Sequence, residues 1–121
     1  MREIKFKAWL KEERKMVNVE TLFIGINRLC FGNSKTEDLF FRDFEEVELM
    51  QYTGLKDKNG KEIYENDLIS CNKHKNIVVF FEGGCFKVKY LRNSTTTITC
   101  TLNSFLEKYK CKISINIYEH P

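Results

Sequence analysis

Residues 77–101 read IVVFFEGGCFKVKYLRNSTTTITCT, and they contain the clearest strand pattern in the chain. The β-branched and aromatic run at 77–81 is typical of a buried strand. At 85–91 apolar residues alternate with lysines, as in a half-buried strand. Gly83-Gly84 and Asn93-Ser94 provide turn chemistry between the runs. The stretch therefore predicts three consecutive strands, of which the last is rich in threonine.

The flanking residues extend this pattern into a small barrel. A short strand precedes it at 68–71, and apolar residues recur at helical spacing over 102–109. Isoleucines then alternate with polar residues in a last strand at 113–117. Four short strands, a helical segment and a final strand follow the order of an SH3-like barrel, which we predict for residues 52–121. The predicted core comprises Leu68, Val78, Phe80, Phe86, Val88, Ile98, Phe105, Ile115 and Ile117.

The first part of the chain predicts a second β lobe, over residues 1–51. Apolar and polar residues alternate at 3–9, a charged turn follows at 11–15, and 16–19 can return as the partner of a hairpin. The pattern leaves the conformation of residues 20–46 open, and residues 36–46 are either a short helix or an irregular acidic loop. We predict a mainly β fold, in which the β-hairpin lobe packs on the barrel as a single domain of 121 residues.

Composition argues against several classes of protein. No apolar run approaches the roughly 20 residues that span a bilayer, and the N-terminus lacks the apolar stretch of a signal peptide. The five cysteines are odd in number and form no CxxC pair, so we expect free thiols in a cytoplasmic protein and no metal site. The sequence indicates no cofactor.

The charges are distributed unevenly. Residues 37–67 carry four basic and ten acidic groups, whereas both flanking parts of the chain are basic and the net charge is +3. This balance is too mild to indicate nucleic acid by itself. An acidic middle between basic ends also permits pairing between two copies, so a homo-oligomer is one expectation.

No catalytic residue is predicted. The two histidines, His74 and His120, lie in a lysine-rich turn and near the C-terminus, where a solvated histidine is expected. The carboxylates of residues 57–67 fall among turn residues, where aspartate binds local backbone N–H groups. We therefore expect a protein that is not an enzyme.

Two groups of residues are candidates for binding. Aromatic residues suited to a protein partner are Trp9, on the polar face of its strand, and Phe40, Phe41 and Phe44 in the acidic stretch. A basic stripe suited to nucleic acid would consist of Lys73, Lys75, Lys87, Lys89 and Arg92. Lysines on edge strands also serve to block aggregation between sheets, and we favour that role for the stripe.

Three stretches resemble the YopX family of phage and prophage proteins. They are LMQYTGLKDKNGKEIYE at 49–65, REIKFKAW at 2–9 and NIYEHP at 116–121, and together they bracket the whole chain. Asn66 stands where the family usually has glycine, Ile115 replaces another common glycine, and residues 18–43 match no known pattern. The resemblance implies a gene of a phage or prophage of a Gram-positive bacterium, and it implies no activity.

Two functions follow as hypotheses. The first is a non-enzymatic accessory protein that binds a host or phage protein, with an anti-defence or regulatory role. The alternative is a small nucleic-acid-binding β-barrel. The mild net charge and the scattered aromatic residues favour the first.

Overall fold

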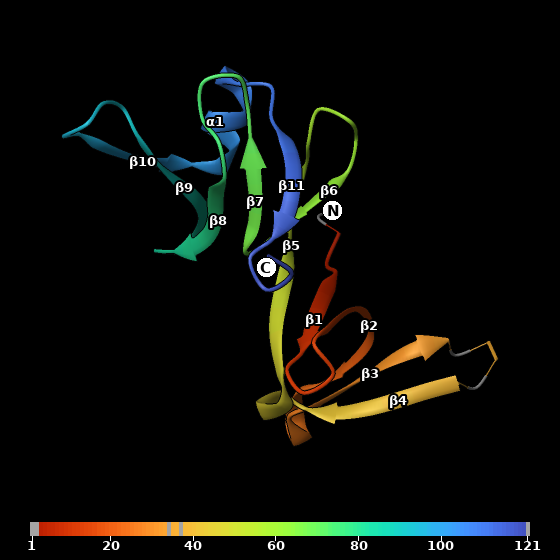
Figure 1. The fold of residues 1–121 in the computed structure, drawn as a ribbon. Helices are drawn as coiled ribbons and strands as arrows, with labels where there is room; N and C mark the ends of the chain where they lie inside the picture. The colour runs from red at the N-terminus through yellow and green to blue at the C-terminus, as the bar shows by residue number, and fades with distance from the viewer. Residues whose placement is uncertain (1–2, 34, 37, 121) are drawn as a thin grey trace. The chain divides into compact units, whose positions relative to one another are not determined.

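The computed structural model describes residues 3–33, 35–36 and 38–120, and its ribbon consists mostly of strands (Figure 1). The predicted mainly β fold class is therefore confirmed. The chain divides into two compact units, an N-terminal unit of residues 3–51 and a C-terminal unit that starts at residue 52. Each unit is described by itself.

The N-terminal unit is one antiparallel sheet in the order β4-β3-β2-β1-β5. Its strands are β1 (Phe6–Leu10), β2 (Lys15–Phe23), β3 (Arg28–Asn33), β4 (Asp38–Asp43) and the first part of β5 (Val47–Lys56). Short 3-10 turns, η1 (Ile24–Ile26) and η2 (Phe44–Glu46), follow β2 and β4. The stretch whose conformation the sequence pattern left open is thus mainly the β3–β4 hairpin and these turns.

Residues 38–43 form the strand β4, so both sequence-based alternatives are wrong for them, and helical conformation in this segment is limited to the single 3-10 turn η2 at residues 44–46. β4 pairs with β3 along its full length, from Asn33↔Asp38 to Arg28↔Asp43. The turn η2 follows, closed by a capping box in which the Asp43 N–H donates to Glu46 Oε1 at 2.8 Å. Local propensity was overridden because β4 gains a full ladder of hydrogen bonds by joining the sheet.

The core of the N-terminal unit is small. Its buried members are Ala8, Leu10, Leu29, Phe31 and Val47. They come from β1, β3 and β5, and the partly buried side chains of Val17, Val19, Leu22, Phe44 and Leu49 pack against them.

The C-terminal unit contains a five-stranded antiparallel sheet, in which four consecutive strands form a meander and the last strand returns to pair with the first of these four. After β6 (Glu62–Tyr64), which pairs with the end of β5, the strands are β7 (Asp67–Ser70), β8 (Ile77–Glu82), β9 (Cys85–Leu91), β10 (Thr97–Thr101) and β11 (Lys112–Asn116). Helix α1 (Leu102–Lys108) separates β10 from β11, and the sheet order is β10-β9-β8-β7-β11. This is the element order predicted for an SH3-like lobe.

The core of this unit differs from the predicted one along β8. Ile77 and Val79 are buried, whereas Val78 is 36% exposed and Phe80 is half-buried, so the face predicted for this strand is wrong. The apolar run at 77–81 has no polar residue to mark the solvent face, and pairing with β7 decided it. The cluster itself consists of Ile63, Ile69, Cys71, Ile77, Val79, Val88, Leu102, Phe105 and Cys111.

The other members of the predicted core divide into two groups. Leu68, Val88 and Phe105 are buried as predicted. The half-buried ones are Phe86, Ile98, Ile115 and Ile117.

Candidate binding surfaces

The aromatic residues proposed for a protein partner do not form one surface. Phe40 and Phe41 are neighbours on β4, and the period of two in a strand directs them to opposite faces. Phe40 stacks on Phe31 with ring centroids 5.5 Å apart. Phe44 packs against the core of the N-terminal unit, and Trp9 is half-buried on β1.

A different set of exposed apolar residues lies in β2, η1 and β4, and two of its members, Phe23 and Phe41, are neighbours. Phe23 on β2 lies near Phe41, with ring centroids 6.3 Å apart, and these side chains are 37% and 46% exposed. Ile24 and Ile26 of η1 follow Phe23 directly and are 69% and 66% exposed. We call these four residues the Phe41 surface. The sequence analysis missed Phe23, Ile24 and Ile26, because the pattern at residues 20–46 did not define a face.

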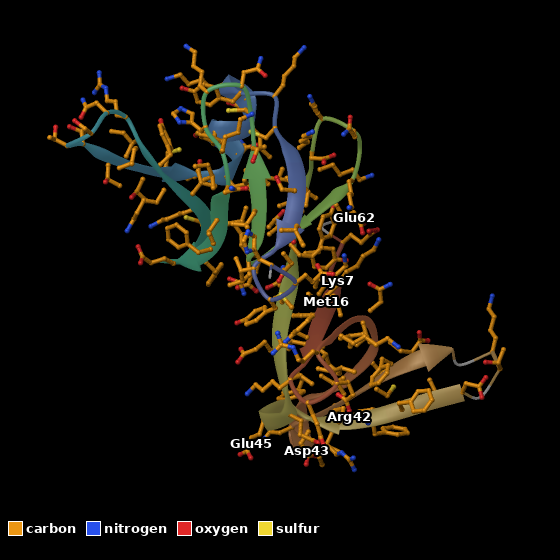
Figure 2. The ribbon with its side chains drawn as sticks, viewed as in Figure 1. Lys7, Met16, Arg42, Asp43, Glu45 and Glu62 are labelled. Atoms are coloured by element: carbon orange, nitrogen blue, oxygen red, sulfur yellow. The ribbon has the colours of Figure 1, made fainter. Side chains whose placement is uncertain are left out.

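Charged residues border the Phe41 surface. The Arg28 guanidinium lies over the Phe41 ring at 5.9 Å, and its Nε is 3.1 Å from Asp43 Oδ1. A hollow of about 270 Å³ adjoins this pair and is lined by Ile26, Asn27, Asp43, Phe44 and Glu45. Figure 2 labels Asp43 and Glu45 at this end of the unit. The border therefore carries the Arg28–Asp43 ion pair and Glu45.

The basic stripe predicted from the sequence does not form either. Lys87 and Lys89 alternate with Val88 and Tyr90 along β9 and point to the opposite face from them. Lys87 Nζ is also 3.8 Å from Glu82 Oε1. Of the five proposed residues, Lys73 and Arg92 line a common pocket.

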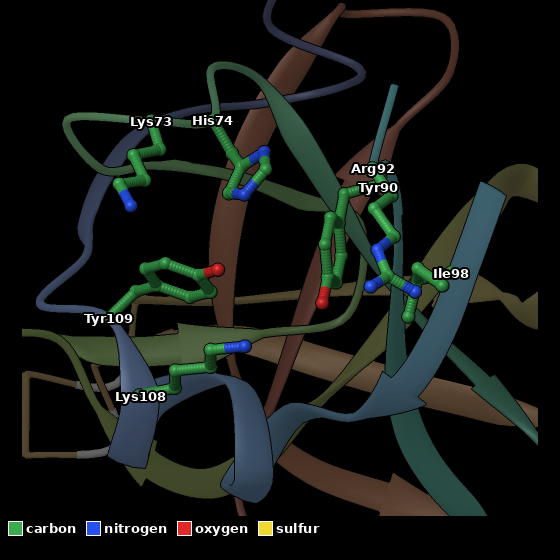
Figure 3. Close-up of a pocket in the computed structure, with 7 residues that line it drawn as sticks. All are labelled: Lys73, His74, Tyr90, Arg92, Ile98, Lys108 and Tyr109. Carbon is green, nitrogen blue, oxygen red and sulfur yellow. The ribbon is translucent and has the colours of Figure 1, made fainter. Parts of the chain in front are cut away.

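That pocket, of about 510 Å³, combines cations with aromatic rings. Its lining residues are Lys73, His74, Tyr90, Arg92, Ile98, Lys108 and Tyr109 (Figure 3). They come from the turn before β8, from the end of β9, from β10 and from the C-terminal end of α1. Close in space but far apart in the chain, they were not recognisable as a group from the sequence.

Packed rings form one wall of the pocket. The centroid of the His74 ring lies 4.6 Å from that of Tyr90 and 5.1 Å from that of Tyr109. Buried Phe105 packs against both tyrosines, with its ring centroid 5.1 Å from that of Tyr90 and 4.9 Å from that of Tyr109. His74 is half-buried in this cluster, so the expectation of a solvated histidine is wrong. The helical stripe that includes Tyr109 was the one signal in the sequence for this wall.

Comparison with known proteins assigns the chain to a family. The sequence model described as YopX protein matches residues 5–121. The chain belongs to the YopX family. A crystal structure of protein EF1440 from Enterococcus faecalis is similar, with 26% sequence identity and a TM-score of 0.64. The match covers 98% of this chain and 96% of that one. No curated protein matches.

The acidic residues of the YopX signature segment have structural partners. Asp57 Oδ1 accepts the N–H groups of Asn59 and Lys61, both at 2.9 Å, and its Oδ2 accepts the N–H of Ile113 at 3.0 Å. Burial alone would raise the pKa of Asp57, but the N–H groups of Ile113, Lys61 and Asn59 together outweigh it and lower the pKa. This carboxylate therefore joins the 57–61 turn to β11.

A second group of buried hydrogen bonds lies directly after the YopX signature segment. Asp67 accepts the Tyr64 N–H at 2.8 Å and the Asn116 side-chain amide at 3.0 Å, and that amide also donates to the Glu65 carbonyl at 3.2 Å. Asn66, which replaces the family's usual glycine, has a φ of 68°. Asparagine tolerates this left-handed conformation well among the residues other than glycine, so the turn is kept.

Among the residues that the structure describes, no three His, Cys, Asp or Glu side chains are grouped to hold a metal ion. No helix in the described part of this YopX protein is long and apolar enough to cross a membrane.

All five cysteines are free, and they should differ in reactivity. Cys30, Cys71 and Cys111 are buried, while Cys85 and Cys100 are half-buried. Burial raises the pKa of Cys100, and burial with neighbouring Cys71 raises the pKa of Cys111 to about 12. Because the thiolate is the reactive species, we expect a disulfide reagent to modify Cys85 first and the buried thiols only after denaturation. Fewer than five reactive thiols in the denatured, unreduced protein would contradict the assignment of all five cysteines as free thiols.

Proposed function

We propose that this YopX-family protein is a non-enzymatic accessory protein of a phage or prophage, and that it acts by binding a host or phage protein. The Phe41 surface is the observation that supports this role most directly. Phe23 and Phe41 are neighbouring exposed rings, and exposed apolar side chains that gather on a small protein commonly mark an interface. Aromatic side chains at the centre of such a surface supply much of the binding energy.

The charge around the Phe41 surface indicates the chemistry of the partner. Asp43 and Glu45 line the adjoining hollow, and residues 3–51 carry ten acidic and eight basic groups. A partner that presents apolar side chains beside lysine or arginine would be complementary to this border. An anti-defence or regulatory role in the bacterial cytoplasm is compatible with such binding. A reducing compartment would suit the free thiols.

Affinity capture from infected host lysate tests the proposal, with nuclease present throughout. The variant Phe23→Asp/Phe41→Asp places charge on the Phe41 surface. Phe81→Asp is the matched control, because Phe81 is a 53% exposed phenylalanine on β8 in the C-terminal unit. We expect a specific protein to be retained by the wild type and the control, and to be lost from the double variant.

The same experiment can contradict the proposal. Equal retention by the double variant and the wild type would remove the Phe41 surface from the interaction. Sedimentation of the purified protein identifies the remaining occupant, a second copy of this chain. A dimer that the double variant abolishes would replace the host or phage partner with self-association.

A further inference from the structure

We propose that the pocket between His74, Tyr90 and Tyr109 binds single-stranded nucleic acid. In this proposal Lys73, Arg92 and Lys108 hold a backbone phosphate and the rings stack on a base. The site lies in the C-terminal unit and shares no residue with the Phe41 surface. It therefore adds a second activity to the proposed protein binding, and the two can fail independently.

The cations of the pocket are not ion-paired in the part of the chain that the structure describes. Within the described residues, no carboxylate is ion-paired with Lys73, Arg92 or Lys108. Lys108 Nζ instead lies over the Tyr109 ring, 5.5 Å from its centroid. Three positive charges around one hollow repel each other and attract an anion. A phosphate would remove this repulsion.

Hydrogen-bond donors converge on the same space. Figure 3 shows the Tyr90 and Tyr109 hydroxyl groups turned towards the interior of the pocket, together with the Lys108 ammonium and the Arg92 guanidinium. All four can donate to phosphate oxygens, and guanidinium and ammonium groups do so with the added benefit of charge. The rings of His74, Tyr90 and Tyr109 are half-buried, so part of each remains accessible to a base.

The positive charge continues beyond the pocket. Two further hollows, of about 270 and 130 Å³, also have Tyr109 in their walls. They add Lys110 and then Lys56 and Lys58 to the cations around this ring. Asp57 lines the smaller hollow, and its carboxylate oxygens already accept three backbone N–H groups.

This row of cations selects among anionic ligands. A polyanion can contact several lysines in succession, whereas a single anionic group would use the first pocket alone. At about 510 Å³ that pocket is also in the size range of sites for whole small ligands, and thus larger than one phosphate requires. An acidic peptide would satisfy the charges but would offer no base to the aromatic wall. The combination favours single-stranded nucleic acid.

Fluorescence anisotropy with a labelled single-stranded DNA and an RNA of about 16 nucleotides tests the proposal. Titrations are made at several salt concentrations up to about 0.15 M. We expect Arg92→Glu/Lys108→Glu to weaken binding at least about tenfold and to reduce the salt dependence, because phosphate contacts are lost. The matched control is Lys87→Glu/Lys89→Glu, which makes the same charge change on the opposite face of β9 and should bind within about twofold of wild type.

A ring variant separates stacking from charge. Tyr109→Leu should weaken binding while leaving the salt dependence unchanged, and Tyr109→Phe, which keeps the ring, should retain most of the affinity. Thermal melting confirms that each variant is folded. No binding by the wild type at the lowest salt, or equal loss in the Lys87 and Lys89 control, would overturn the proposal. So would displacement by polyglutamate as effective as by unlabelled oligonucleotide, since the ligand would then be any polyanion.

Discussion

Replacing Phe105 with alanine is expected to lower the free energy of unfolding by about 3–5 kcal/mol. Phe105 is 2% exposed and joins α1 to the core of the C-terminal unit, where it also supports the rings of Tyr90 and Tyr109. Its removal deletes apolar contacts and leaves a cavity that the surrounding strands can fill only in part. Chemical denaturation followed by circular dichroism measures the loss.

The control for this prediction is the same chemical change on an exposed ring. Phe81→Ala removes a side chain that is 53% exposed, so it should cost no more than about 1 kcal/mol. If Phe105→Ala leaves no folded protein to titrate, Phe105→Leu keeps most of the volume and should cost less than about 1.5 kcal/mol. Similar stabilities for Phe105→Ala and Phe81→Ala would show that α1 does not anchor this core.

Replacing Asp57 with alanine is expected to cost about 2–4 kcal/mol through lost hydrogen bonds. Three backbone N–H groups lose their acceptor at once, and one of them belongs to Ile113, 56 residues away in the chain. Asp57→Asn should cost less, because Oδ1 is kept while the new amide group cannot accept from Ile113. Asp38→Asn, on an exposed residue of β4, is the control and should change stability by less than about 0.5 kcal/mol.

Acid should diminish the Asp57 effect. Because the pKa of Asp57 is lower in the folded protein than in the unfolded chain, its ionisation stabilises the fold at neutral pH. That contribution is complete above the unfolded pKa of about 3.9 and is lost as the pH falls through the lower folded pKa. The difference in stability between wild type and Asp57→Ala should therefore shrink with acidification. A difference independent of pH from 7 to about 2 would contradict the assigned contacts.

Local sequence patterns were sufficient for β7 to β11 and α1 of the C-terminal unit, but not for the short strand β6. Alternation predicted β9, the spacing of Leu102, Phe105 and Tyr109 predicted α1, and turn residues marked the loops between strands. These signals are reliable because strand and helix periods are properties of the backbone itself. The turn at Asn66 was also predictable, since few residues tolerate a positive φ.

The sequence by itself also determined the family. The signature segment 49–65 is recognisable because its turn residues must suit the backbone and because Asp57 must bind particular N–H groups. Such requirements fix the residue type at each position, so they can be recognised in the sequence alone. The binding roles predicted for individual surface residues do not fix a residue type in this way, so the local sequence could not specify them.

Only the tertiary structure decided which side chains share a surface. Phe23 meets Phe41 because β2, β3 and β4 pair in one particular register, whereas the alternation of side chains along β4 separates Phe40 from Phe41. Lys73, Arg92 and Lys108 surround one pocket because the meander and α1 bring three distant segments together, whereas Lys87 and Lys89 point away from it. Periodicity specifies the face of a single element, but the pairing of elements depends on long-range contacts that no local pattern encodes.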